Sequence, residues 1–204
     1  MRITIIGASG HGKVVADIAQ LVGYDEIVFL DDDPSVSKCG GFPVVGNTTS
    51  PIEGDVFVAI GNGHIRERLA TYRKLVTLVH PSAVVARDVT IGPGTVIMAG
   101  AVINSGATIG VGCIVNTCAS VDHDCEVGDY VHVSVGAHLC GAVTVGNHTW
   151  VGAGATVSNG ISICCNCTIG AGAVVIRDIG EEGTYVGVPV NRIDNRSRGH
   201  ANHP

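Results

Sequence analysis

The sequence is poor in leucine and in aromatic residues. Its 204 residues include 6 Leu against 32 Val and 19 Ile, and Trp, Tyr and Phe together number eight. Because β-branched side chains lose more freedom in a helix than in an extended chain, this composition argues against an all-helical protein. With 46% hydrophobic and 15% charged residues, the chain is also too apolar to be disordered. We therefore expect a core of small aliphatic side chains.

Basic residues and long apolar runs are scarce as well. The formal net charge is −6, and Arg87 is the only Lys or Arg between residues 79 and 176, so we expect no nucleic-acid partner. The apolar run in residues 1–7 is too short for a signal peptide, which favours a cytoplasmic protein. Two stretches without charged residues, 89–121 and 130–176, are long enough to cross a membrane, but polar residues interrupt both, so we expect no membrane span.

The eight cysteines do not indicate a disulfide framework. The chain shows no export signal and is longer than the small secreted domains that depend on disulfides. Cys164, Cys165 and Cys167 lie close together, but the paired C-x-x-C blocks of a zinc site are absent. We expect free, mostly packed thiols and no metal cofactor.

A repeat of six residues dominates the sequence from residue 79 onward. Seventeen positions spaced six apart, from Val79 to Val175, are all aliphatic, and the residue four positions after each is mostly small or β-branched. A period of six fits neither a helix nor a long two-faced strand, but it fits short strands joined by tight corners. Since three such strands make one triangular coil, the repeat predicts a parallel β-helix of about five and a half coils.

The first 78 residues follow a different pattern. Short apolar segments alternate with helical ones: predicted strands at 3–6, 26–30 and 55–60, and predicted helices at 13–21 and 64–75. This alternation indicates a small parallel sheet in a Rossmann-like α/β domain. We expect domain boundaries at 1–78 and 79–193, followed by a disordered polar tail over 194–204.

A glycine-rich turn, Gly-Ala-Ser-Gly-His-Gly over residues 7–12, separates the first predicted strand from its helix. Such a turn presents backbone N–H groups and a helix N-terminus to a phosphate. Its G-x-x-G-x-G spacing favours a nucleotide diphosphate over NAD, while a turn that only packs helix on strand is the alternative. Ligands of such sheets bind at the carboxyl ends of the strands. The predicted nucleotide-binding residues are Ser9, Gly10, His11, Asp31, Asp32, Ile60, Gly61 and Asn62.

The most acidic segment of the predicted β-helix surrounds His123. This residue lies two positions after the inward Val121 and therefore projects outward near a corner. Its neighbours Asp122 and Asp124 favour the charged imidazole and so raise its pKa; a solvated polar corner is the alternative. One coil further along lies Gly141, which leaves space for an acyl group and offers a backbone N–H to an oxyanion.

Small residues continue along the axis of the predicted β-helix. Ala153 and Ala171 are one coil apart, so we expect a groove that fits an extended pantetheine arm.

Over about residues 1–193 the sequence resembles the sialic acid O-acetyltransferase (NeuD-like) and bacillosamine-type (PglD-like) sugar acyltransferases. The shared motifs are the glycine turn, Phe-Leu-Asp-Asp-Asp, Ala-Ile-Gly-Asn, His-Asp-Cys, His-Val-Ser-Val-Gly-Ala and Val-Gly-Val-Pro-Val-Asn-Arg-Ile. The resemblance implies a left-handed β-helix, a homotrimer with active sites between subunits, acetyl-CoA as cosubstrate and a sugar nucleotide as acceptor.

The resemblance also implies roles for individual residues. His123 would be the general base and Asp124 the carboxylate that orients it. Bacillosamine-type enzymes often have Glu at that position, and because Asp is a methylene shorter, Asp122 is the alternative orienting group. The remaining implied contacts are Asn116, His132 and Gly141 at the acyl site, Ala153 and Ala171 at coenzyme A, and Ser9, Gly10, His11 and Asp31, Asp32 and Asp33 at the sugar nucleotide.

Together these features predict an acetyl-CoA-dependent acetyltransferase that acts on a nucleotide-linked sugar. N-acetylation of a UDP-4-amino-sugar is favoured, with O-acetylation of sialic acid as the alternative. Two other classes stay open: a metalloenzyme of the γ carbonic anhydrase kind, for which His123, His132, His138 and His148 are available, and a non-catalytic sugar-nucleotide-binding scaffold. The sequence leaves the sugar, the nucleotide base and the acyl group undetermined.

Overall fold

The computed structural model describes residues 1–71 and 73–193, so the tail expected at 194–204 lies outside the described residues. The N-terminal part contains a five-stranded sheet with the order β3-β4-β2-β1-β5. The strands are β1 (Arg2–Ile6), β2 (Glu26–Leu30), β3 (Lys38–Cys39), β4 (Phe42–Gly46) and β5 (Asp55–Val58), and the helices are α1 (Gly10–Leu21) and α2 (Gly63–Ala70). As predicted, β1 pairs in parallel with both β2 and β5.

Several details of this sheet and its helices differ from the prediction, and β5 ends at Val58 rather than at residue 60. Strands β3 and β4, at one end of the sheet, were not predicted, because β4 contains a proline and has no buried residue. Helix α1 begins at Gly10 rather than Lys13, and Gly12 packs so closely on Gly7 that a side chain there would overlap its carbonyl oxygen. Helix α2 ends at Ala70 rather than Leu75, and Leu75 instead forms a parallel bridge with Val56.

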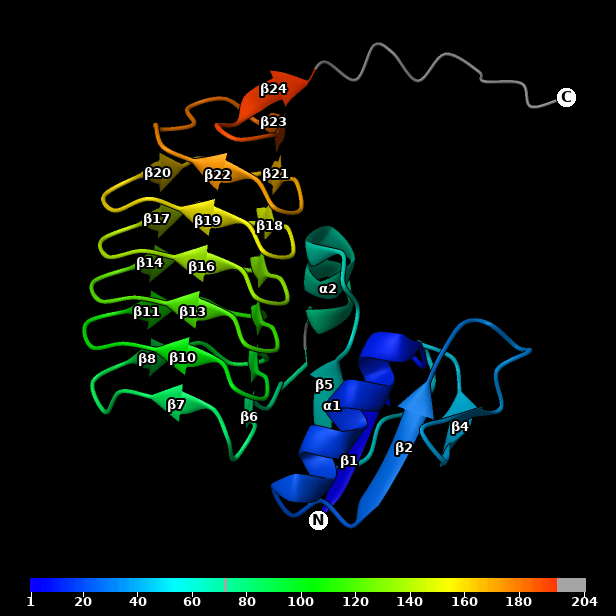
Figure 1. Ribbon diagram of the computed structural model, residues 1–204. Coiled ribbons are helices and arrows are strands. Elements are labelled where there is room, and N and C mark those ends of the chain that lie inside the picture. The colour runs from blue at the N-terminus through cyan, green and yellow to red at the C-terminus, as the bar shows by residue number, and fades with distance from the viewer. Residues whose placement is uncertain (72, 194–204) are drawn as a thin grey trace, which may run out of the picture.

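From residue 78 onward the chain winds into a triangular parallel β-helix, whose coils are stacked in Figure 1. We call its three sheets face 1, face 2 and face 3. Each edge is named after the two faces that it joins, so that edge 2/3 lies between face 2 and face 3. Face 1 holds β6 (Leu78–Val79), β9 (Val96–Ile97), β12 (Ile114–Val115), β15 (His132–Val133), β18 (Trp150–Val151), β21 (Cys167–Ile169), β23 (Gly183–Val186) and β24 (Asn191–Ile193). Face 2 holds β7 (Val84–Val85), β10 (Val102–Ile103), β13 (Ser120–Val121), β16 (His138–Leu139), β19 (Thr156–Val157) and β22 (Val174–Val175). Face 3 holds β8 (Thr90–Ile91), β11 (Thr108–Ile109), β14 (Glu126–Val127), β17 (Thr144–Val145) and β20 (Ser162–Ile163).

The six-residue repeat fills the interior of this β-helix. From Ile97 to Val175, none of the repeat positions is more than 4% exposed, and the small residues between them are buried beside them. Val102 pairs with Ser120, and Ser120 with His138, so a coil takes 18 residues. The predicted coil length and inward positions are therefore confirmed.

The α/β domain packs against the outer side of face 1, where Figure 1 places α1 and α2 beside the β-helix. Leu78, Val96, Met98 and Ile114 from the first coils share one apolar cluster with residues of β1, β2 and α1. Burial of these apolar surfaces fixes one domain on the other. Among the described residues, the structure contains no helix long and apolar enough to cross a membrane.

All eight cysteines lie within the described residues and are free thiols. Cys39, Cys113, Cys125 and Cys167 are buried, whereas Cys118 and Cys165 are exposed. The expectation of free thiols is confirmed, and only part of the set is packed in the core.

Candidate active site

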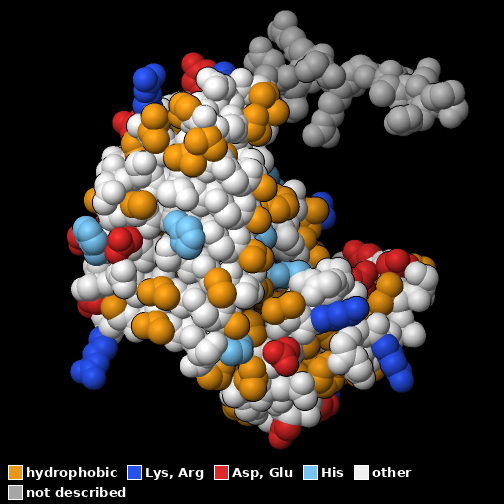
Figure 2. All heavy atoms as spheres, viewed as in Figure 1, with side chains coloured by type: hydrophobic (Ala, Val, Ile, Leu, Met, Phe, Trp, Pro, Cys, Tyr) orange, Lys and Arg blue, Asp and Glu red, His pale blue; other side chains and the backbone are white. Residues whose placement is uncertain are grey.

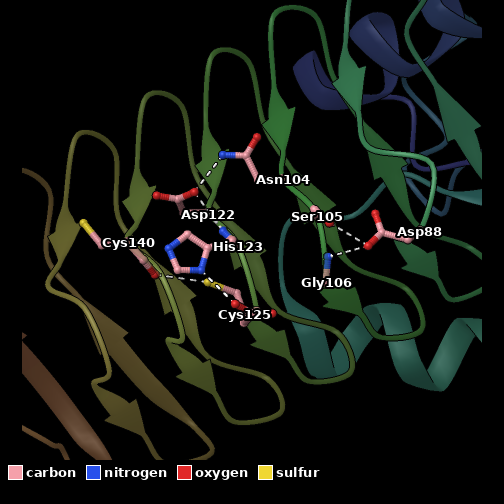
Figure 3. Close-up of polar contacts among 9 residues, drawn as sticks. Asp88, Asn104, Ser105, Gly106, Asp122, His123, Cys125 and Cys140 are labelled. Carbon is pink, nitrogen blue, oxygen red and sulfur yellow. Dashed lines mark hydrogen bonds and ion pairs between the residues drawn. The ribbon is translucent and has the colours of Figure 1, made fainter.

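His123 lies at edge 2/3, in the corner between β13 and β14. Its Nδ1 is 2.8 Å from Oδ2 of Asp124, and both side chains are largely exposed. Asp122 instead accepts hydrogen bonds from the backbone N–H of His123 and from Nδ2 of Asn104, at 2.8 and 2.7 Å. Figure 3 shows Asp122 directed away from the ring toward Asn104. In the structure, Asp124 is therefore the carboxylate that contacts the imidazole.

The surroundings of His123 favour a basic imidazole, one nitrogen of which has no hydrogen-bond partner among the described residues. Its hydrogen bond with Asp124, assisted by the negative charges of Asp122 and Asp124, raises the pKa of His123 above its ordinary value. The other ring nitrogen, Nε2, faces Gly141 one coil away, where a Cβ atom would overlap it. The 18-residue spacing correctly places Gly141 beside His123, but the imidazole ring itself lies in the space next to Gly141 that was predicted for an acyl group.

Asn116, His132, Ala153 and Ala171 line one groove on face 1 and edge 1/2, with a volume of about 490 Å³. The rest of its lining is Ser134, Val135, Trp150, Gly152, Thr168, Ile169 and Gly170. Nδ2 of Asn116 is 3.1 Å from Nε2 of His132, and the His132 ring stacks on Trp150 with 5.2 Å between centroids. The indole N–H of Trp150 donates to the Ser134 hydroxyl at 2.6 Å, which fixes the wall of the groove.

The predicted site residues thus form two groups on different edges of one chain. His123, Asp124 and Gly141 follow strands of face 2, whereas Asn116, Ala153 and Ala171 follow strands of face 1. The residues of one group stack along the axis, but face 2 separates them from the other group. A single chain does not bring the base and the groove together.

Of the residues predicted at the glycine turn, His11 lies where the two domains meet. Ser9 is the N-cap of α1, although its side chain makes no capping hydrogen bond, and Gly10 begins the helix. The ring of His11 lies 6.4 Å from that of His132. Burial, with a contribution from the charge of Arg66, lowers the pKa of His11 to about 4 and that of His132 to about 3. Nε2 of His11 and Nδ1 of His132 are buried without a hydrogen-bond partner among the described residues.

The three consecutive aspartates hold the loops at the carboxyl ends of the strands. Asp31 accepts from the backbone N–H of Ala8 in the glycine turn at 2.6 Å, Asp32 accepts from Thr48, and Asp33 from Ser35. Two cavities of about 420 and 320 Å³ meet at Asp31 and Asp32, and Asp33 lines the larger one. The aspartates therefore border open space at the predicted end of the sheet while also bracing its loops.

Gly61 and Asn62 connect this domain to the groove. They line a small polar cavity of about 160 Å³ that shares His132, Trp150 and Thr168 with the groove. Asn62 caps α2 by accepting from the backbone N–H of Ile65 at 3.1 Å. The small cavity therefore joins the loop after β5 to the groove.

Sequence reasoning missed Arg66 on α2, which is 1% exposed. Its guanidinium donates to carbonyl oxygens of both domains, and burial lowers its pKa to about 10. These carbonyls belong to Ile60, Gly61, Gly112, Tyr130 and Val131, at 2.7 to 3.4 Å. No pattern in the charged segment His-Ile-Arg-Glu-Arg distinguishes this arginine from exposed neighbours.

Within residues 1–71 and 73–193, the histidines do not converge on a metal position in the way that the γ carbonic anhydrase alternative requires. Within one chain, His123, His132 and His138 lie at edge 2/3, on face 1 and on face 2. His64, Glu67 and His148 do approach one another within 4.8 Å. However, the two imidazoles stack at 4.1 Å with 18° between their planes, so their in-plane lone pairs do not point at one ion.

An α/β domain on one face of a triangular β-helix, with a buried histidine pair at their junction, defines a class of two-domain β-helix proteins. The PglD N-terminal domain family model matches residues 2–72. The acetyltransferase domain of PglB from Neisseria gonorrhoeae is 42% identical, with 94% of this chain and 99% of that chain covered and a TM-score of 0.90. PerB from Caulobacter crescentus, solved with CoA and GDP-perosamine, is 36% identical, with 95% and 98% covered and a TM-score of 0.89.

A curated relative gives a consistent result over a shorter segment. UDP-N-acetylbacillosamine N-acetyltransferase from Bacillus subtilis is 38% identical over 111 residues, 48% of this chain and 51% of that protein, so the match spans about half its length. The chain belongs to the PglD-like family of left-handed β-helix acyltransferases. The predicted family and fold class are confirmed.

Proposed function

We propose that the protein transfers an acetyl group from acetyl-CoA to an amino group of a nucleotide-linked sugar. The observation that carries this proposal is the His123–Asp124 pair, whose free Nε2 faces the side-chain-free Gly141. The relatives support the substrate class: the PglB domain has also been solved with acetyl coenzyme A, and PerB with CoA and GDP-perosamine. A cytoplasmic location remains a prediction.

His123 acts as general base in the proposed reaction. Its Nε2 takes a proton from the sugar amine as the amine nitrogen attacks the thioester carbonyl carbon. The backbone N–H of Gly141, which forms no backbone hydrogen bond among the described residues, donates to the oxyanion of the tetrahedral intermediate. Collapse of the intermediate breaks the carbon–sulfur bond and releases CoA as the thiolate. Asp124 holds the imidazole by accepting from Nδ1.

The two groups of site residues support a homotrimer in which neighbouring β-helices share each active site. One subunit would supply His123, Asp124 and Gly141 from edge 2/3. Its neighbour would supply the groove at edge 1/2, with Asn116 and His132 at the acyl group and Ala153 and Ala171 along coenzyme A. The sugar nucleotide would bind to the α/β domain through Ser9, Gly10, His11, Gly61, Asn62 and Asp31, Asp32 and Asp33.

Activity of the purified protein and of His123→Ala tests the proposed function. With UDP- and GDP-linked 4-amino-sugars and acetyl-CoA, we expect CoA release by the wild type and a loss of at least about a hundred-fold in kcat for His123→Ala. Sugar-nucleotide affinity, measured by calorimetry, should be nearly unchanged, since His123 is remote from the α/β domain. Full turnover by His123→Ala would contradict the proposal, and binding without any turnover by the wild type would favour the scaffold alternative.

Mixed trimers test the shared site. His123→Ala and His132→Asn chains are each expected to be nearly inactive alone. If each site takes one residue from each neighbour, a trimer that contains both kinds of chain has one complete site in three, so it should recover about a third of wild-type activity. Co-expression with two affinity tags isolates these mixed trimers. Absence of recovery in assembled mixed trimers would show that both residues act within one chain.

A further inference from the structure

The corner one coil before the proposed base lies directly beside it along edge 2/3. Pairing of β10 with β13 places Asn104, Ser105 and Gly106 in line with Asp122, His123 and Asp124. Figure 3 shows the two corners side by side, with Asn104 directed at Asp122. The earlier corner therefore forms the surface on which the base corner rests.

Gly106 provides the space that the carboxylate of Asp124 occupies. A Cβ atom at Gly106 would overlap Oδ1 of Asp124 and lie 3.4 Å from its Cγ. Asp124 itself has a φ of 57°, and its backbone N–H donates to the carbonyl of Ser105 at 3.1 Å. The backbone of Asp124 is thus fixed, and its short side chain lies directly over Gly106.

Asp88, one further coil back, fixes the turn that carries Gly106. Its Oδ2 accepts from the backbone N–H of Gly106 at 3.0 Å and from the hydroxyl of Ser105 at 2.7 Å. These bonds lower the pKa of Asp88, so the carboxylate stays charged at neutral pH. Hydrogen bonds between successive coils therefore hold in place the turn on which Asp124 rests.

Asn104 fixes the other carboxylate. Its Nδ2 donates to Oδ1 of Asp122 at 2.7 Å, and the same oxygen accepts the backbone N–H of His123 at 2.8 Å. With Oδ1 held by both donors, Asp122 caps the backbone of the corner and stays away from the ring. Two aspartates that are equivalent in sequence therefore have different contacts.

We propose that Asn104 and Gly106 are positioning residues for the base: Asn104 keeps Asp122 on the backbone, and the missing side chain of Gly106 lets Asp124 reach Nδ1 of His123. This inference rests on the proposed function for its kinetic consequences. Its structural content is that the contact between Asp124 and His123 depends on the corner one coil away.

Gly106→Ala tests the inference, with Gly160→Ala as the matched control. Gly160 lies at the same edge with a φ of 68°, against 77° at Gly106, but has no atom within 4 Å of an added Cβ. Both changes therefore add similar backbone strain, and only Gly106→Ala displaces Asp124. We expect Gly106→Ala to lower kcat about ten-fold with the KM for acetyl-CoA unchanged, and to lower the pKa of His123 in an NMR titration. Equal effects of the two changes on kcat and on the titration would overturn the inference.

Asn104 is tested by two substitutions, which also serve if Gly106→Ala does not fold. Asn104→Asp keeps the side-chain shape but replaces the donor by a second carboxylate, whereas Asn104→Ala removes both shape and donor. If the hydrogen bond positions Asp122, both variants lose about five-fold or more in kcat. Retention of full kcat by Asn104→Asp would overturn the role of Asn104.

Failure of this inference differs from failure of the proposed function. If the wild type transfers acetyl and His123→Ala does not, while Gly106→Ala and Gly160→Ala behave alike, only the positioning role is wrong. If the wild type transfers no acetyl group, the proposed function is wrong. The NMR titration of His123 in the two glycine variants still shows whether Gly106 controls the contact with Asp124.

Discussion

At the scale of single residues, the site depends on which carboxylate contacts His123. The sequence places Asp122 and Asp124 symmetrically around the histidine and leaves both as orienting groups. The structure distinguishes them because Asp124 adopts a left-handed backbone conformation that turns its side chain toward Nδ1. The backbone conformation at a corner depends on contacts with the neighbouring coil. These contacts cannot be inferred from the residues that are adjacent in sequence.

The pH dependence of kcat/KM checks this contact. A general base must be neutral to accept a proton, so activity falls as pH drops through the pKa of His123, which lies above its ordinary value of 6.5. Asp124→Asn removes the largest cause of the increase, so the acidic limb of the profile should move to lower pH while the plateau falls about ten-fold or more. Asp17→Asn, remote on α1, is the control. An unmoved limb in Asp124→Asn would contradict the assigned contact.

At the scale of elements, α2 joins the domains through one buried side chain. The planar guanidinium of Arg66 reaches carbonyls of the loop after β5 and of two coils of the β-helix. Lysine carries a single ammonium group and cannot reproduce this fork. Loss of the fork leaves buried carbonyl oxygens without donors, which is more costly than loss of an exposed ion pair.

Arg66→Lys is therefore expected to lower the free energy of unfolding by about 3 kcal/mol, or roughly 6 to 12 °C in Tm for a chain of this size. Thermal melting followed by circular dichroism measures the change. Arg68→Lys, two residues away on the exposed side of α2, should shift Tm by less than about 2 °C. A similar shift in Tm for both variants would contradict the role of Arg66 in joining the two domains.

Much of the element pattern is predictable from the sequence, and the reason is periodicity. Each inward residue of the β-helix, such as Val133, lies in the same kind of environment as the residue six positions away. The requirement for an aliphatic side chain therefore recurs at seventeen positions. Arg66 and strand β4 have no such repetition, and their positions depend on contacts with distant segments. Neither the burial of a single charged side chain nor the pairing of a short strand without alternating burial produces a periodic pattern in the sequence.

At the scale of the whole molecule, two neutral imidazoles lie buried where the domains meet. In the unfolded chain both would titrate near 6.5, whereas in the folded protein burial lowers the pKa of His11 to about 4 and of His132 to about 3. A lowered pKa stabilises the fold above 6.5, and this stabilisation is lost as pH falls toward the folded values. Acidification therefore weakens the contact between the domains.

Chemical denaturation at pH 7.5 and pH 5 measures this effect. We expect the wild type to lose on the order of 2 kcal/mol for each buried ring at pH 5. His11→Asn should reduce the loss by about one ring's share, whereas His138→Asn at the exposed surface of face 2 should not. Equal pH dependence in the wild type and His11→Asn would show that His11 does not contribute.

The 18-residue coil also restricts how the length of this chain can change in evolution or by design. Insertion of six residues between Gly106 and Asn116 would rotate every later corner by one third of a turn about the axis, moving the groove from edge 1/2 to edge 2/3 and the base from edge 2/3 to the edge between faces 3 and 1. Insertion of 18 residues would preserve every angle and only translate the later coils by about 4.8 Å. Viable length variants of this region should therefore differ by whole coils. Any other insertion must form a loop that protrudes at a corner, so that the later strands stay on their original faces.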